Sequence, residues 1–292
     1  MFSAMTTTRA RRTPDESTAQ VAALHAQLAA LGNPARAAHE QRYLKSDLAF
    51  LGVGVPGVRN TAKKFVRSHP LDHDQLMRLT RALWAHKVHE LRAVAIAILE
   101  LSREKLTTAD LPVLISLVRE SKTWALVDWL AIKVIGPLSS DPNARRQITD
   151  WARDPDFWVR RTALLCHHDA LLRGQGDFEH FASMAEPLLD DPEFFIRKAI
   201  GWVLRSTAKR TPRRTYAFVA KHARALSGLS FREATRALAP AQQKQLIALR
   251  EARGGARKKE PAGKARTAKP TPRKDTPRPR SPRSSGVRTS TA

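Results

Sequence analysis

The sequence contains the same ten-residue phrase twice, and this repetition limits the possible folds more than any other feature. The copies lie 37 residues apart and read Asp154-Pro155-Asp156-Phe157-Trp158-Val159-Arg160-Arg161-Thr162-Ala163 and Asp191-Pro192-Glu193-Phe194-Phe195-Ile196-Arg197-Lys198-Ala199-Ile200. In each copy Asp-Pro predicts the start of a helix, because proline is tolerated in the first turn and a carboxylate satisfies free N–H groups there. Weaker copies around Arg92 and Leu126 give successive offsets of 34, 34 and 37 residues. Such a period predicts stacked helix pairs that share one core.

This pattern resembles the HEAT repeat, in which the Asp and the Arg six residues later are expected to pair from one helical hairpin to the next. That resemblance gives Arg160 and Arg197 a structural role. Apolar residues recur at helical spacing almost everywhere over residues 21–250, and no segment alternates convincingly with the period of a strand. We therefore predict an all-α protein, a right-handed α-solenoid of HEAT-like helical hairpins with a concave basic face. Predicted helices include 111–120, 124–135 and 157–172.

Charge divides the chain into three parts. The 292 residues carry 51 Lys and Arg against 27 Asp and Glu, a formal charge of +24. Residues 253–292 hold 13 basic and 2 acidic side chains with many prolines, which predicts a disordered tail that either solubilises the protein or adds DNA affinity. Residues 1–18 form a short flexible tail at +1, so the predicted repeat domain, 19–252, keeps +12. A basic folded domain indicates a polyanionic partner.

Other composition features exclude several classes of protein. Cys166 is the only cysteine, which excludes an intrachain disulfide and a cysteine-based zinc cluster, and it is expected to be a small buried residue. The chain shows neither a secretory signal nor a stretch of about 20 apolar residues. We expect a soluble cytoplasmic protein associated with the nucleoid. The triplet His167-His168-Asp169 is not expected to bind a metal, because adjacent helical residues point apart.

Trp124 and Asp128 form the strongest candidate for a chemical site. They are four residues apart, so on a helix they lie on one face with Cβ atoms about 5–6 Å apart. Asp128 aligns with Thr162 and Ala199, so a carboxylate replaces a small residue there. Two structural alternatives stay open. Trp124 could be a core aromatic residue, and Asp128 could form a buried ion pair with a basic neighbour.

Arg161 and Lys198 follow the two ladder arginines directly. Each is turned by about 100° from its neighbour on a helix of ~3.6 residues per turn. They are therefore predicted to be free to meet phosphate, with a solvated surface cation as the alternative.

Taken together, Trp124 with Asp128, the segment 157–161 and above all the segment 193–205 resemble the bacterial DNA alkylation repair glycosylases of the AlkD family. The resemblance runs from about Leu28 to Leu238. It implies a solenoid that grips duplex DNA in its concave face and cleaves the N-glycosidic bond of cationic N3- or N7-alkylated purines such as 3-methyladenine and 7-methylguanine. By this resemblance Asp128 is the catalytic carboxylate, Trp124 and Trp202 are aromatic walls, and Arg161 lies beside the backbone of the lesion. We also predict DNA contacts at Arg59, Arg161, Lys198 and Arg205, no cofactor or metal, no membrane partner and a monomeric protein.

A site with one carboxylate and no general acid suits this reaction. A cationic alkylpurine leaves as a neutral base and needs no general acid, so a single carboxylate can stabilise the positive charge that develops on the sugar. Two other functions stay open at this point. One is a catalytically silent HEAT module that binds DNA, for which Asp128 would be dispensable. The other is a protein-interaction scaffold, which would not need a basic concave face.

Overall fold

The structure is a computed structural model that describes residues 16–252. Its first helix begins at Glu16, within the segment 1–18 for which a flexible tail was predicted. The predictions for residues 1–15 and for the basic tail, 253–292, lie outside the described residues.

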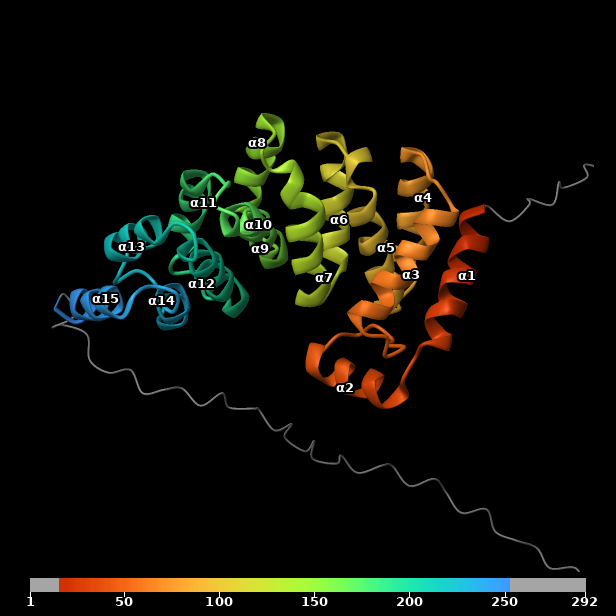
Figure 1. Ribbon diagram of the computed structural model, residues 1–292, viewed down its shortest axis with the longest axis horizontal. Coiled ribbons are helices and arrows are strands. Elements are labelled where there is room, and N and C mark those ends of the chain that lie inside the picture. The colour runs from red at the N-terminus through yellow and green to blue at the C-terminus, as the bar shows by residue number, and fades with distance from the viewer. Residues whose placement is uncertain (1–15, 253–292) are drawn as a thin grey trace, which may run out of the picture. The chain divides into compact units, whose positions relative to one another are not determined.

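Within residues 16–252 the chain is helical, with one isolated β-bridge between Ala49 and Val88 and no strand. The all-α prediction is confirmed, and the helices follow one another side by side as an α-solenoid (Figure 1). No helix in this range is long and apolar enough to cross a membrane. The helices are α1 Glu16–Ala30, α2 Pro34–Leu44, α3 Val55–Ser68, α4 His73–Ala85, α5 His89–Leu101, α6 Leu111–Glu120, α7 Trp124–Trp129, α8 Pro142–Trp151, α9 Phe157–Leu165, α10 His168–Leu172, α11 Phe178–Ala185, α12 Phe194–Ala208, α13 Pro212–Lys221, α14 Gly228–Thr235 and α15 Pro240–Ala252.

Two rows of helices form the repeats. In one row α5, α7, α9, α12 and α14 each contact the next. Helices of the other row back them, with α4 against α5, α8 against α9, and α13 against both α12 and α14. Because each repeat contacts mainly its neighbours, side chains from successive repeats meet along the first row.

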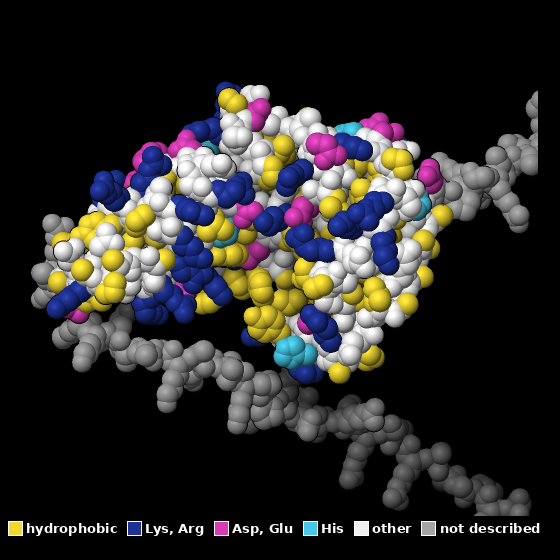
Figure 2. Space-filling model, in the orientation of Figure 1, with side chains coloured by type: hydrophobic (Ala, Val, Ile, Leu, Met, Phe, Trp, Pro, Cys, Tyr) yellow, Lys and Arg dark blue, Asp and Glu magenta, His cyan; other side chains and the backbone are white. Residues whose placement is uncertain are grey.

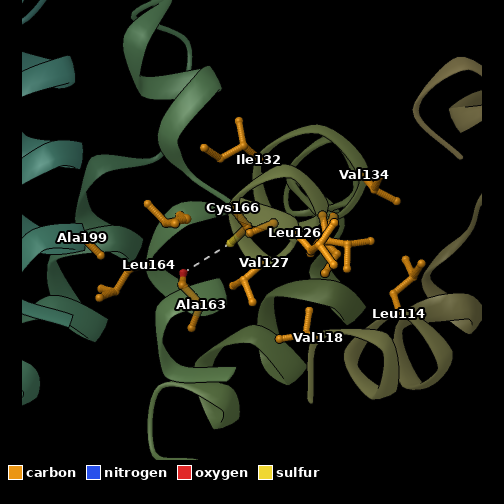
Figure 3. Packing of buried hydrophobic residues seen from close by; sticks show 14 of the residues in the cluster. Leu114, Val118, Leu126, Val127, Ile132, Val134, Ala163, Leu164, Cys166 and Ala199 are labelled. Carbon is orange, nitrogen blue, oxygen red and sulfur yellow. Dashed lines mark hydrogen bonds between the residues drawn. The ribbon is translucent and has the colours of Figure 1, made fainter. Parts of the chain in front are cut away.

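A continuous apolar core fills the space between the two rows. Side chains of α6, α7 and α9, among them Leu114, Leu126 and Leu164, pack together there (Figure 3). Cys166 lies in this core, and its thiol donates to the carbonyl oxygen of Ala163 at 3.2 Å. Burial raises the pKa of the Cys166 thiol far above its ordinary value. The prediction that this cysteine is a small buried residue is confirmed.

The predicted ladder between repeats is present at Arg160 but not at Arg197, which has no ion pair with a carboxylate of residues 16–252. Nε of Arg160 lies 3.0 Å from the Asp191 carboxylate of the next repeat, and the Asp154 carboxylate accepts from Arg119 at 2.8 Å. Arg160 and Arg197 also each donate to the carbonyl oxygen six residues earlier, at 2.8 Å in both repeats. The structural role of Arg160 is confirmed, since its guanidinium joins two repeats.

The repeated Asp-Pro does not open the helices as predicted. Helix α9 begins at Phe157 and is capped by Asp156, while the Asp154 side chain accepts the N–H of Asp156 at 2.9 Å. Asp191 accepts the N–H of Glu193 in the same way, at 2.8 Å. Each Asp therefore closes a turn before its helix, because a short carboxylate readily accepts the backbone N–H two residues on.

The helix predicted over 124–135 changes form after its first turns. Helix α7 ends at Trp129, and residues 130–135 form a π-helical turn ahead of Gly136 and Pro137. Proline cannot continue an α-helix, because it has no N–H and its ring clashes with the preceding turn. Gly136 also approaches α9 closely, since a Cβ there would lie 2.8 Å from the carbonyl oxygen of Cys166. The helix predicted over 157–172 is likewise divided, into α9 and α10.

A buried carboxylate fixes the turn that follows α2. The Glu90 side chain is fully buried, and its two oxygens accept the backbone N–H groups of Leu51, Gly52 and Val53 at 2.6–3.1 Å. Gly52 has a φ of +77°, and a Cβ there would lie 2.1 Å from the carbonyl oxygen of Asn33, which caps α2. The turn therefore holds one end of α2, a helix that buries none of its own residues.

Candidate active site

A cleft of about 360 Å³ lies where α2, α7, α9, α12 and α14 meet. The molecule is hollowed on this side, with Lys and Arg side chains gathered along one edge of the hollow (Figure 2). All four residues predicted to be catalytic line the cleft, as do three of the four predicted DNA contacts. The lining residues are Tyr43, Trp124, Asp128, Arg161, Phe194, Phe195, Lys198, Trp202, Arg205 and Glu233.

An ion pair between Asp128 and Arg161 forms the floor of the cleft. Nε and Nη2 of Arg161 donate to the two carboxylate oxygens of Asp128 at 2.7 and 2.8 Å, and Nη1 donates to the carbonyl oxygen of Phe195. The Arg161 side chain is 2% exposed and that of Asp128 is 13% exposed. The prediction that Arg161 is free to meet phosphate is wrong, because its guanidinium is buried and bound by Asp128. Each oxygen of the carboxylate retains a further lone pair, so Asp128 can still face a ligand.

Aromatic side chains surround this carboxylate. Trp124 lies one helical turn before Asp128 on α7, whose first turn is capped by the Thr123 side chain. Trp124 is half-buried and meets the ring of Tyr43 edge to face, with 5.9 Å between ring centroids. Trp202 lines the cleft from α12. The two tryptophans therefore line the same cleft as Asp128.

Tyr43 is a cleft residue that the sequence did not reveal. It is 65% exposed and belongs to α2, which lies far from α7 in the sequence. The signal in the sequence was the polar composition of α2, because a helix that is polar all round is not held in place by an apolar face of its own.

The two remaining cations of the cleft differ in their surroundings. Nη1 of Arg205 lies 2.6 Å from the Glu233 carboxylate of α14. Lys198 is exposed and lies 5.8 Å from the ring centroid of Phe194, and no carboxylate of residues 16–252 is within ion-pair distance of it. Lys198 is thus the cleft cation that is most open to an anionic ligand.

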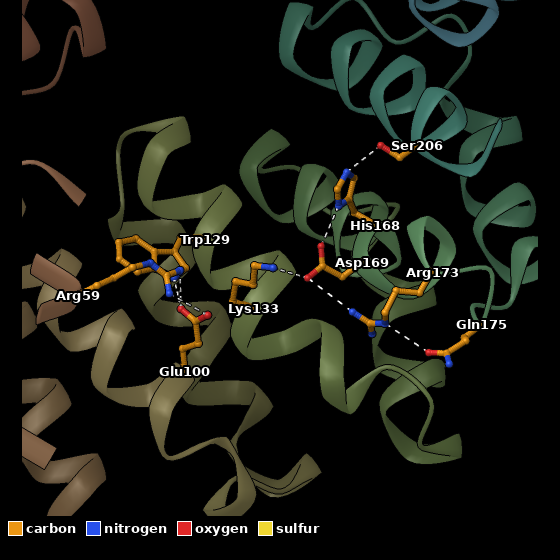
Figure 4. A network of polar contacts seen from close by, with 9 residues as sticks. All are labelled: Arg59, Glu100, Trp129, Lys133, His168, Asp169, Arg173, Gln175 and Ser206. Atoms are coloured by element: carbon orange, nitrogen blue, oxygen red, sulfur yellow. Dashed lines mark hydrogen bonds and ion pairs between the residues drawn. The ribbon is translucent and has the colours of Figure 1, made fainter. Parts of the chain in front are cut away.

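Arg59 lies outside this cleft. Its guanidinium pairs with Glu100 at 2.9 Å and lies 4.6 Å from the ring centroid of Trp129. The indole N–H of Trp129 also donates to Glu100, at 2.7 Å (Figure 4). Glu100 faces a second cleft, of about 450 Å³, together with Lys133 and Asp169. Arg59 therefore belongs to a polar network at the second cleft and not to the cleft that contains Asp128.

The His167-His168-Asp169 triplet separates into two environments. His167 is buried in the core against His180, and burial lowers its pKa to about 3. Nδ1 of His168 is hydrogen-bonded to Asp169, so these two neighbours do not point apart as predicted. Within the described part of the chain, no group of three or more His, Cys, Asp or Glu side chains is arranged to hold a metal ion.

Comparisons with known proteins agree with this architecture. A solved structure described as a predicted DNA alkylation repair enzyme from Enterococcus faecalis is 25% identical in sequence, with a TM-score of 0.64. The match covers 72% of this chain and 97% of that chain. A search of curated proteins gave no match. The family model for the DNA alkylation repair enzyme matches residues 24–238, which is most of the described chain. The protein thus belongs to the DNA alkylation repair enzyme family.

Proposed function

We propose that this protein is a monofunctional DNA glycosylase that removes cationic N3- and N7-alkylated purines from duplex DNA by hydrolysis. The observation that carries the proposal is the carboxylate of Asp128, which opens into a cleft lined by Trp124 and Trp202. Membership of the DNA alkylation repair family supports a role in repair of alkylated DNA. The basic surface beside the cleft supports duplex DNA as the substrate.

The proposed reaction needs little acid catalysis. When the bond between the sugar C1′ and the base nitrogen breaks, its electron pair neutralises the cationic base, which leaves without a proton. Positive charge then develops on the sugar, and the Asp128 carboxylate stabilises it electrostatically. Water adds to C1′ and releases a proton, which completes the hydrolysis.

In the proposed complex, the walls of the cleft bind the alkylated nucleotide and the rim binds the DNA backbone. The tryptophan faces hold the cationic base or the sugar by cation–π and dispersion contacts worth ~0.5–2 kcal/mol each. Lys198 meets a phosphate of the DNA backbone, since its side chain is exposed and lines the cleft. Arg161 acts on the reaction through Asp128, whose two oxygens it holds in a fixed plane.

The test compares two carboxylates that each accept from an arginine. Asp128→Asn is expected to lower the single-turnover release of 7-methylguanine by about 10²–10³-fold, the loss found when one electrostatic stabiliser is removed. Asp191→Asn is the matched control, because it removes the partner of Arg160 away from the cleft. Melting curves for both variants separate a loss of stability from a loss of chemistry.

Two outcomes would contradict the proposal. Excision by Asp128→Asn at the parent rate would remove the carboxylate from the mechanism. A parent protein that binds alkylated duplex DNA and releases no free base would make the cleft a binding site alone. In that case Asp128 would serve only in the ion pair with Arg161, which already donates to both oxygens of its carboxylate.

A further inference from the structure

His168 packs against the indole of Trp202 from inside the protein. The ring centroids of His168 and Trp202 are 4.8 Å apart, with an interplanar angle of 56°. His168 is 7% exposed and does not line the cleft, whereas Trp202 does. The imidazole therefore supports the tryptophan wall from behind.

Both nitrogens of this imidazole are held by hydrogen bonds. Nδ1 lies 3.1 Å from the Asp169 carboxylate, and Nε2 lies 2.9 Å from the hydroxyl oxygen of Ser206. Because a carboxylate can only accept, Nδ1 carries the proton and the Ser206 hydroxyl donates to Nε2. Burial lowers the pKa of His168, which keeps the ring neutral at pH 7. Its orientation is thus fixed at two points.

These contacts connect the two sides of the cleft. Ser206 lies one helical turn after Trp202 on α12, so His168 touches both residues on one face of that helix. Asp169 pairs with Lys133, in the π-helical turn that continues from α7 and its Asp128 (Figure 4). Burial acts to raise the pKa of Asp169, but the hydrogen bonds from Lys133 and His168 lower it overall. The chain Lys133–Asp169–His168–Ser206 therefore ties the Asp128 segment to the helix that carries Trp202.

We propose that His168 is a positioning residue that fixes Trp202 relative to Asp128 for base excision. This role rests on the proposed glycosylase function. A neutral imidazole also places no positive charge behind a wall that receives a cationic base. Because excision depends on the geometry of the bound nucleotide, releasing Trp202 slows the chemical step more than it weakens DNA binding.

The test replaces His168 and follows Trp202 directly. The protein is labelled with 5-fluorotryptophan, and the ¹⁹F resonance of Trp202 is assigned with Trp202→Phe. His168→Ala is expected to shift or broaden this resonance. It is also expected to lower the saturating single-turnover rate constant about tenfold, less than the ~10²-fold loss that a 1 Å misplacement can cause. The affinity for undamaged duplex DNA stays at the parent value.

Two further variants keep the result interpretable. His180→Ala is the matched control, because His180 is also a buried histidine but contacts Thr149 and His167 and does not line the cleft. It is expected to leave both readouts unchanged. Ser206→Ala removes only the hydrogen bond to Nε2, so a smaller change in the same direction is expected even if His168→Ala folds poorly.

The outcomes separate this inference from the function on which it rests. An unchanged Trp202 resonance and an unchanged rate in both His168→Ala and Ser206→Ala would overturn the positioning role, as would equal losses in His180→Ala. A parent protein that releases no base would overturn the glycosylase proposal instead, while the ¹⁹F shift would still report whether His168 fixes Trp202.

Discussion

Arg160 and Arg161 are neighbours in the sequence, but their side chains point in different directions and bind different carboxylates. Arg160 and Arg161 are turned from each other by about 100° on α9. Arg160 joins the ladder to Asp191 with 15% of its side chain exposed, while Arg161 turns inward to Asp128 and is 2% exposed. The same side-chain chemistry thus supports the stack in one case and the cleft in the other.

This difference predicts distinct effects of removing each arginine. Arg161→Ala leaves the Asp128 carboxylate without its partner, and breaking a buried pair costs about 3–5 kcal/mol. Arg160→Ala removes a more exposed interaction and is expected to cost about 1–3 kcal/mol. Urea unfolding measures these losses, and single-turnover assays are expected to show that only Arg161→Ala loses excision. Equal stability of Arg161→Ala and the parent would disprove the buried pair.

At the scale of a helix, α2 depends on its ends. None of its residues is buried, but it carries Tyr43 to the cleft. Its first turn is capped by the Asn33 side chain, which accepts the N–H of Arg36 at 2.9 Å. The turn around Gly52 then packs against that same end. The position of Tyr43 therefore follows from a close backbone contact some way along the chain.

Two glycines with the same backbone angle test this contact. Gly52 and Gly174 have φ values of +77° and +78°, but only a Cβ at Gly52 would overlap backbone atoms. Gly174→Ala is expected to cost about 1–2 kcal/mol, the penalty for a left-handed conformation. Gly52→Ala adds a steric clash and is expected to cost at least about 3 kcal/mol. Unfolding free energies of the two variants decide this, and equal losses would show that the packing of α2 tolerates the extra carbon.

For the molecule as a whole, positive charge is shared between the folded repeats and the tail. Deleting residues 253–292 removes a charge of +11 and begins directly after α15. The slope of log K against log[salt] for undamaged duplex DNA is expected to fall by about 0.9 for each phosphate that the tail neutralises. The control keeps the tail and replaces its Lys and Arg with Gln, which should match the deletion. A slope unchanged by the deletion would assign all of the salt dependence to the remaining chain.

Local periodicity in the sequence determined the repeats and most of the helices. The helix at 111–120 has the predicted bounds. Trp124 and Asp128 line one cleft, which agrees with the shared helix face that their spacing of four residues predicts. Such features depend on 3.6 residues per turn and on which positions are apolar, and both are properties of a short stretch of chain.

The partners of the site residues were decided only by the tertiary structure. Asp128 meets Arg161 from a helix 33 residues away, Tyr43 reaches Trp124 from α2, and Glu233 reaches Arg205 from α14. Each contact depends on how one helix is rotated and shifted against the next repeat, which close packing of many side chains fixes together. The sequence therefore singled out Asp128, Trp124 and Trp202, and it left a buried ion pair with a basic neighbour open for Asp128. The stacking of repeats determined that Arg161 is this neighbour and that Tyr43 joins the cleft.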